Sequence, residues 1–174
     1  MPTIRATVGQ AVVRFLAAQY SERDGARRRL VPGVWAIFGH GNVAGLGQAL
    51  EELGDELDLP TYRPQNEQAM VHVAAAYAKH VNRLATFACT ASIGPGSANM
   101  LTAAAGATIN RLPVLLFPSD IFASRRPDPV LQQLEHPVEH DVTVNDALRP
   151  VSRFFARVDR PEQLLAVLPA AMRV

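Results

Sequence analysis

Short apolar runs alternate with longer amphipathic segments along most of this chain, and this alternation constrains the fold more than any other feature. Residues 34–38, 84–91 and 113–118 carry no charged side chain and have the length of buried strands. Apolar residues recur at helical spacing in the segments around them, which are 4–16, 46–53, 67–81, 97–110 and 161–172. Strands joined by helices of this length form parallel sheets. We therefore predict a three-layer α/β fold, with helices on both faces of an open, mostly parallel sheet.

The remaining segments predict less regular structure. Residues 60–64 are expected to be extended, residues 21–32 to form a polar loop and residues 153–158 to form a last strand. The stretch 119–150 is expected to be irregular, with one short helix at 130–134. A length of 174 residues suits a single domain with one sizeable core, covering residues 1–174.

Charge and cysteine content argue against several function classes. The chain has 17 Lys and Arg against 16 Asp and Glu, so it lacks the basic excess of proteins that bind nucleic acid or anionic membranes. The basic run 27–29 is expected to lie in the solvated loop. Cys89 is the only cysteine, which fits a reducing cytoplasm, and its apolar surroundings predict a buried, unreactive thiol. No apolar run is long enough to span a bilayer.

Three loops should meet at the carboxyl edge of the sheet, where open parallel sheets bind ligands. The first, Gly39–Gly45, follows a predicted strand and leads into a helix. Its glycine spacing differs by one residue from the dinucleotide-binding fingerprint. Together with Arg63, this loop could meet a nucleotide that carries a 2′-phosphate. Equally, the glycines could simply make a tight turn.

The other two loops add a carboxylate and a rigid turn. Asn66 is expected to cap the helix 67–81, which puts Glu67 in the first turn of that helix. A first-turn glutamate often does no more than complement the helix dipole. The third loop contains Gly94-Pro95-Gly96, a turn that lets a ligand approach the backbone closely. Each loop alone is a weak signal, but the three together form a constellation.

The segment His136–His140 spells H-x-x-E-H, a motif of one group of zinc peptidases. That motif needs a helix that brings both histidines to one face, and a third ligand elsewhere. The segment lies in the irregular region, and the sequence offers no evident third ligand. We therefore expect no metal site in this chain.

In this order, the three loops resemble the N-terminal pyrimidine-binding domain of the acetolactate-synthase-like thiamine-diphosphate enzymes. In that family a glutamate opens an Ala-rich helix that ends in Tyr-Ala, as Glu67 and Tyr77-Ala78 do here. A strand, a Ser-Gly-Pro-Gly-type turn and a helix with an early Asn follow, as in residues 84–99. Two departures are Asn66, where the family often has His, and Ile93, which is inserted before the Gly-Pro-Gly. The resemblance covers nearly the whole chain.

The resemblance implies roles for these residues. Glu67 matches the glutamate whose carboxyl group hydrogen-bonds the aminopyrimidine ring of thiamine diphosphate and thereby promotes removal of the cofactor's thiazolium C2 proton. Gly41 and Asn42 would lie on the substrate side of the cofactor. The other expected cofactor-binding residues are Pro64, Gly94, Pro95, Gly96 and Asn99.

The same resemblance implies that the chain supplies half of a site. The family binds Mg²⁺ and the diphosphate with a Gly-Asp-Gly motif in another domain, and the nearest spelling here, Gly54-Asp55-Glu56, lacks the second glycine. We therefore expect either a fragment of a longer protein or a natural small subunit. Either would work with a diphosphate-binding domain in a homo-oligomer, and the chain alone would be inactive.

The spellings Phe38–Asn42 and Ser92–Gly96 are most similar to one branch of the family. That branch hydrolyses a carbon–carbon bond of a cyclic 1,2-diketone in bacterial inositol breakdown. Three alternatives stay open. The chain could be the pyrimidine-domain subunit of a two-chain 2-oxo acid decarboxylase or acetolactate-synthase-like enzyme, a stand-alone Rossmann-like nucleotide-binding module, or a non-catalytic oligomerisation domain.

Overall fold

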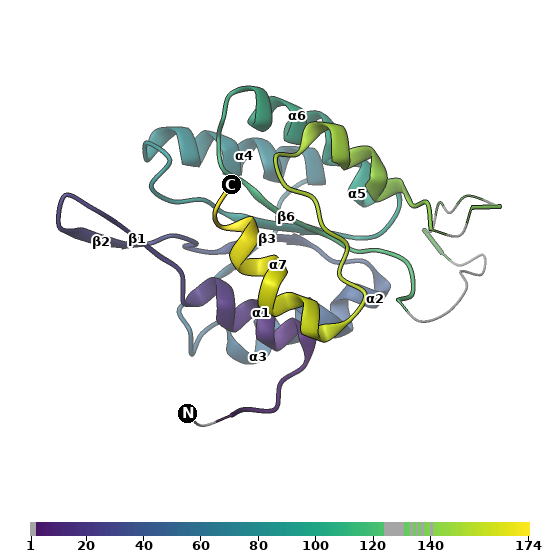
Figure 1. The fold of residues 1–174 in the computed structure, drawn as a ribbon, viewed down its shortest axis with the longest axis horizontal. Helices are drawn as coiled ribbons and strands as arrows, with labels where there is room; N and C mark the ends of the chain where they lie inside the picture. Colours follow the sequence, from purple (N-terminus) through teal and green to yellow (C-terminus); the bar gives the residue numbers. More distant parts are fainter. Residues whose placement is uncertain (1–2, 124–130, 133, 135, 137, 140) are drawn as a thin grey trace.

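A parallel four-stranded sheet forms the centre of the molecule (Figure 1). The computed structural model describes residues 3–123, 131, 132, 134, 136, 138, 139 and 141–174. The strands β3 (Val34–Ile37), β4 (Thr61–Tyr62), β5 (Ala88–Ala91) and β6 (Leu115–Pro118) lie in the order β4-β3-β5-β6, and every neighbouring pair is parallel. The predicted α/β fold class is therefore confirmed.

Helices cover both faces of this sheet (Figure 1). One face carries α1 (Val8–Ala17), α3 (Gln48–Leu53) and α7 (Leu164–Ala171), and the other carries α4 (Glu67–His80), α5 (Pro95–Asn99) and α6 (Leu101–Ile109). Each face has its own apolar core. Ala88 of β5 packs in the first core, while Cys89 and Ala91 pack in the second. The alternation of side chains along a strand thus divides one short sequence between two layers.

Capping side chains fix where the longer helices begin. Oγ1 of Thr7 accepts a hydrogen bond from the N–H of Gln10 at 3.1 Å, and Oε1 of Gln10 accepts one from the N–H of Thr7 at 3.0 Å. Asn66 caps α4 as predicted, because its Oδ1 accepts a hydrogen bond from the N–H of Ala69 at 2.8 Å. This cap determines that Glu67 is the first residue of α4.

The buried face of α4 is shifted from the predicted one. Met70 and Ala74 are buried as expected and Tyr77 is half-buried, but Val73 is 44% exposed. Val71 is buried instead. The reason is that α4 contacts both β5 and α6, so its buried stripe turns toward α6 rather than lying squarely on the sheet.

Residues 20–29 form a β-hairpin where a polar loop was expected. The strand β1 (Tyr20–Arg23) pairs antiparallel with β2 (Ala26–Arg29). Asp24 and Gly25 between them both have positive φ, 53° and 75°, as a two-residue hairpin turn requires. The loop prediction was wrong because both strands are charged and mostly exposed, and so lack the apolar pattern that predicts a strand. The Asp-Gly pair between them is the signal that identifies the hairpin.

The expected tight loop at 39–42 is the beginning of a helix. α2 (His40–Asn42) starts directly after Gly39 and continues into a π-helical turn, η1 (Val43–Gly47), before α3. The third loop also becomes helical earlier than predicted. α5 begins at Pro95, whose missing N–H has no partner to lose in a first turn, and Met100 separates α5 from α6.

The C-terminal part departs furthest from prediction. A 3-10 helix, η2 (Val144–Val151), lies in the stretch expected to be irregular, and residues 153–158 are not a strand. Arg157 gives the physical reason. Its guanidinium group donates hydrogen bonds to Asp120 and Asp146, at 2.8 and 3.0 Å, so this segment is held by a side chain rather than by backbone pairing. A 3-10 turn, η3 (Pro161–Gln163), then leads into α7 close to where a final helix was predicted.

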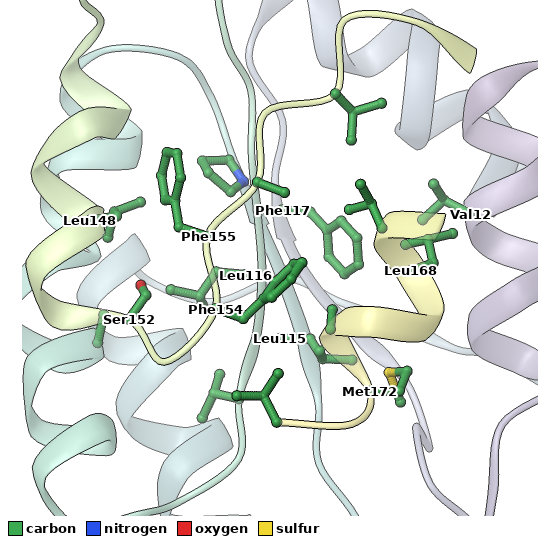
Figure 2. Close-up of a pocket in the computed structure, with 18 of the residues that line it drawn as sticks. Val12, Leu115, Leu116, Phe117, Leu148, Ser152, Phe154, Phe155, Leu168 and Met172 are labelled. Carbon is green, nitrogen blue, oxygen red and sulfur yellow. The ribbon is translucent and has the colours of Figure 1, made fainter. Parts of the chain in front are cut away.

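A cavity of about 950 Å³ lies between β6 and the C-terminal segment (Figure 2). Leu115 and Phe117 of β6 line it, and so do Phe154, Phe155 and Leu168. Residues 153–158 therefore contribute apolar side chains to this cavity beside β6.

The helix predicted at 130–134 includes residues 130 and 133, which lie outside the described residues. Within the described part of the chain, no helix is both long enough and apolar enough to cross a membrane.

Candidate functional site

The loops after β3 and β5 leave the sheet toward opposite faces. These two strands are neighbours, yet the first loop leads to α2 and α3 on one face and the second leads to α5 on the other (Figure 1). Such a divergence opens a crevice beyond the carboxyl ends of the strands, where α/β sheets bind ligands. α4 follows β4 and therefore begins at the same edge.

Glu67 lies at this edge with one carboxylate oxygen fixed. Its Oε2 accepts a hydrogen bond from Nδ2 of Asn99, the last residue of α5, at 2.8 Å. Among the described residues, no group donates a hydrogen bond to Oε1. The side chain is half-buried. Glu67 therefore offers one oriented oxygen to a ligand, at the positive end of the α4 dipole.

Two glycines bring the turn before α5 close to this carboxylate. A Cβ atom on Gly96 would lie 3.2 Å from Oε1 of Glu67 and 2.2 Å from Oγ of Ser92. Gly94 has a φ of 70°, and a Cβ atom there would lie 1.7 Å from the carbonyl oxygen of Gln132. Side chains at either position would disturb the turn, so the approach to Glu67 depends on their absence.

Ser92 connects the same turn to the loop after β3. A Cβ atom on Gly39 would lie 2.5 Å from Cβ of Ser92, so the two loops touch at this point. The carbonyl oxygen of Ser92 accepts a hydrogen bond from Oγ of Ser97 at 2.7 Å, which fixes the turn against α5. Oε1 of Gln132 lies 3.5 Å from the Cβ position of Gly39, so Gln132 contacts both loops.

Gly41 and Asn42 are oriented differently. Gly41 is exposed, with no heavy atom within 4 Å of its Cβ position. Nδ2 of Asn42 donates a hydrogen bond to Oγ1 of Thr90 at 2.8 Å, and this hydroxyl donates to the carbonyl oxygen of Phe117 at 2.8 Å. The amide of Asn42 thus ties α2 to the ends of β5 and β6, rather than contacting Glu67.

The predicted site residues fall into two groups. Glu67, Gly96 and Asn99 are in mutual contact, with Gly94 and Pro95 adjoining them in the turn. Gly41 and Asn42 lie at the start of α2, across the crevice, and Pro64 is half-buried in the link between β4 and α4.

Sequence reasoning missed three residues that shape this edge: Ser92, Thr90 and Gln132. A buried polar residue in or just after an apolar strand was a usable signal for Thr90 and Ser92, which are 0% and 5% exposed. Gln132 had no such signal, because it lies in a stretch without periodicity.

The glycines of the first loop do not form a phosphate cradle. Gly45 packs against α1, since a Cβ atom on Gly9 would lie 2.7 Å from the carbonyl oxygen of Gly45. Gly39 packs against Ser92, which leaves Gly41 alone facing open space. Arg63 is exposed. These contacts argue against the dinucleotide interpretation, and the alternative of a tight turn is wrong as well, because the segment is the start of α2 and η1.

No group of three or more His, Cys, Asp or Glu that could hold a metal ion occurs among the described residues. Of the zinc-like motif, residues 137 and 140 lie outside the described residues. Nδ1 of His136 accepts a hydrogen bond from the N–H of Glu139 at 2.9 Å, so His136 closes a local bend. Gly54-Asp55-Glu56 lies at the end of α3, and thus at the amino edge of the sheet.

Two further features lie away from the carboxylate. The cavity of Figure 2 is lined by Asn42 but by none of the residues around Glu67. Cys89 is fully buried, and burial raises the pKa of its thiol to about 12, which keeps it protonated and unreactive. Neither feature adds a reactive group to the edge.

Comparison with known proteins gives this arrangement a family context. The sequence profile of "Thiamine pyrophosphate enzyme, N-terminal TPP binding domain" matches residues 31–141. Curated relatives named 3D-(3,5/4)-trihydroxycyclohexane-1,2-dione hydrolase align with all 174 residues. One from Geobacillus thermodenitrificans is 55% identical, one from Bacillus cereus 53% and one from Bacillus thuringiensis 52%. The chain spans 27% of the length of each of these relatives.

Proposed function

Because this chain belongs to the N-terminal, cofactor-binding domain family of the thiamine pyrophosphate enzymes, we propose that its carboxyl edge binds the aminopyrimidine ring of thiamine diphosphate (TPP). Glu67 is the proposed partner of the ring nitrogen. The observation that carries this proposal is the hydrogen bond from Asn99 to Oε2 of Glu67, which leaves Oε1 beside the Gly94–Gly96 turn.

The residues present suit such a ring. An aminopyrimidine has a flat face and an edge that carries ring nitrogens and an amino group. A turn without side chains at Gly94 and Gly96 allows the flat face to approach the backbone, and Oε1 of Glu67 has no other donor among the described residues. Pockets for small ligands combine this kind of close apolar surface with a few placed polar groups.

The chain's own contribution is to orient a proton. Thiamine diphosphate, when bound, supplies a nucleophilic carbon that attacks a carbonyl group and allows the bond beside that group to break. Oε1 of Glu67 would share a proton with the ring nitrogen, and Asn99 would keep the carboxylate from rotating away. The Asn66 cap would keep Glu67 in position beside Asn99, because it fixes the first residue of α4.

We further propose that the whole protein hydrolyses a carbon–carbon bond of a cyclic 1,2-diketone, as the name of its relatives indicates. In this proposal a second domain, from the same chain or another subunit, holds the diphosphate and Mg²⁺. The two parts would meet over the cofactor in a homo-oligomer. Pro64 and Pro95 would border the cofactor, and Gly41 and Asn42 would face the substrate.

Turnover of the cyclic diketone by the full-length protein tests the proposal. We expect Glu67→Gln to lower turnover by about a hundredfold or more, the usual effect of removing a general acid–base group. Glu162→Gln, an exposed glutamate before α7, is the matched control and should behave like the wild type. Normal turnover by Glu67→Gln would show that the role given to this carboxylate is wrong.

A further inference from the structure

The β1–β2 hairpin projects from the body of the molecule (Figure 1). Three of the four residues in each strand are exposed. A two-stranded hairpin without a third strand or a covering helix has little stability of its own. The hairpin also precedes the stretch 31–141 matched by the cofactor-domain profile, although it lies within the span shared with the relatives. The hairpin therefore lies outside the part of the chain that this profile matches.

The side chains on one face of the hairpin have partners within the chain. Register places Tyr20 opposite Arg29 and Glu22 opposite Arg27. The guanidinium group of Arg27 lies 4.1 Å from the centre of the Tyr20 ring. Arg29 donates a hydrogen bond to the carbonyl oxygen of Leu57 at 2.9 Å. These contacts attach the base of the hairpin to the end of α3.

The opposite face is basic and has few partners. It carries Arg23 and Arg28. The nearest contact of Arg23 is a 3.7 Å ion pair with Asp24 in which both side chains are largely exposed, and no ion pair or side-chain hydrogen bond involves Arg28 among the described residues. Oγ of Ser21 on the same face donates to the carbonyl oxygen of Leu84, which sets this face beside Arg83. No Asp or Glu occurs between residues 68 and 119, so the neighbouring chain adds no compensating carboxylate.

The end of α3 has the opposite charge. Residues 30–62 contain no Lys or Arg. Five exposed carboxylates lie close together on α3 and the turn after it, which we call the acidic patch: Glu51, Glu52, Asp55, Glu56 and Asp58. Only Asp58 is paired with a cation within the described residues, at 3.6 Å from Arg29.

We propose that the basic face of the hairpin in one copy of the protein docks on the acidic patch of a second copy. The two surfaces are complementary in charge, and both project from the same end of the molecule. The bond from Arg29 to Leu57 comes from the other face of the hairpin, so the basic face is turned away from the acidic patch of its own copy and is open to that of a second copy. A two-fold axis between them lets each copy give its hairpin and receive the other, so the contact closes as a symmetric pair. The exposed charges on both hairpin edges also disfavour strand-to-strand addition, so side chains make the contact.

Charge exchange between two variants tests this contact. In the symmetric pair, residue 28 of each copy faces residue 56 of the other. Two copies of Arg28→Glu, or two copies of Glu56→Arg, therefore bring like charges together at both contacts. A pair with one copy of each variant has opposite charges at both contacts. Both residues are exposed, so folding should be unaffected. By sedimentation of the full-length protein at low salt, we expect each variant alone to associate about tenfold more weakly than the wild type, and the mixture to recover. Recovery should disappear at high salt.

A thiol cross-link keeps the test decisive if other interfaces also hold copies together. Cys89, the chain's only cysteine, is buried, so cysteines introduced elsewhere in this chain are its accessible thiols. When Arg28→Cys and Glu56→Cys copies are mixed and oxidised, peptide mass spectrometry should find the 28–56 disulfide. Glu162→Cys, an exposed glutamate before α7, should give no comparable link to residue 28. Equal linkage to residues 56 and 162, no linkage to residue 56, or a charge-swapped mixture that does not recover would overturn the proposal.

Discussion

At the carboxyl edge of the sheet, Glu67 and Arg157 are bonded to partners within the chain, whereas the basic face of the hairpin, at the amino edge, is exposed and has few partners. Glu67 is held by Asn99, and Arg157 is bonded to both Asp120 and Asp146. At the amino edge, Arg23 has only a long, exposed contact with its neighbour Asp24. The difference indicates that the polar side chains of the two regions have different roles. A site that must orient one proton needs fixed groups, while a surface that must meet another molecule keeps its charges free.

Glycines contribute to the same contrast. Gly94 and Gly96 are closely surrounded, and a side chain at either would meet another group. At the hairpin tip, Gly25 has open space around it and is required only by its positive φ of 75°. The turn before α5 therefore depends on close packing, and the hairpin tip depends on local conformation.

The largest effect on stability should separate a closely packed glycine from one in open space. Gly94→Ala forces a side chain into positive φ and against the carbonyl group of Gln132, so we expect a loss of about 2–3 kcal/mol in unfolding free energy. Gly106→Ala lies in α6 with open space around it, so we expect a gain of about 0.5–1 kcal/mol. Urea unfolding of both variants gives the two values. Equal changes would mean that the turn is not closely packed.

The next effect compares an ion pair at each edge. Arg157→Ala leaves half-buried Asp120 without its cation and Asp146 with Arg149 alone, and we expect unfolding free energy to fall by about 2 kcal/mol. Arg23→Ala removes an exposed pair, and its effect should stay below about 0.5 kcal/mol. The same urea titration measures both. A smaller loss for Arg157→Ala than for Arg23→Ala would contradict the contrast between the edges.

A smaller effect should come from the cap that positions Glu67. Asn66→Ala leaves the N–H of Ala69 without its acceptor, so unfolding free energy should fall by about 1 kcal/mol. Asn66→Ser, which keeps an oxygen that can cap, is the control and should lie within a few tenths of a kcal/mol of the wild type. Similar losses in both variants would show that the cap contributes nothing to α4.

The smallest effect should appear on acidification. Burial alone would raise the pKa of Asp146, but hydrogen bonds from Arg149, the N–H of Thr143 and Arg157, together with the charge of Arg157, lower it to about 2. The folded state therefore binds this proton less readily than the unfolded state, whose carboxyl titrates near 3.8. The stabilisation is complete above about pH 4 and is lost as the pH falls toward 2.

Unfolding curves measured across this pH window provide the check. Asp146→Asn should show a shallower pH dependence than the wild type between pH 4 and 2, with Asp55→Asn, an exposed carboxylate, as the control. Equal slopes for Asp146→Asn and the wild type would mean that the network around Arg157 does not act through this carboxylate.

The sequence predicted those parts of the molecule that short-range signals determine. The Asn66 cap, the buried strands and the turn Gly94-Pro95-Gly96 can each be recognised from a few neighbouring residues. The parallel-sheet pattern predicted that the loops of Glu67 and Gly94–Gly96 meet at one edge, but the hydrogen bond between Glu67 and Asn99, 32 positions apart, did not follow from spacing.

The failures share a physical cause. Residues 153–158 have the composition of a strand, but Arg157 bonds to one carboxylate in the loop after β6 and another in η2. Likewise, Val73 fitted the helical stripe of α4, yet the position of α6 turned Val71 inward. Tertiary contacts decide both outcomes, and no local pattern reports them. The hairpin is different, since its Asp-Gly turn was readable from the sequence.

The central claim is that Glu67 shares a proton with the pyrimidine ring of thiamine diphosphate. The most direct test is the rate at which the C2 proton of the bound cofactor exchanges with deuterium, measured by NMR on the full-length protein saturated with thiamine diphosphate and Mg²⁺. We predict that Glu67→Gln slows this exchange by about a hundredfold or more, whereas Glu162→Gln leaves it unchanged. An exchange rate in Glu67→Gln equal to that of the wild type, with the cofactor bound, would contradict the account.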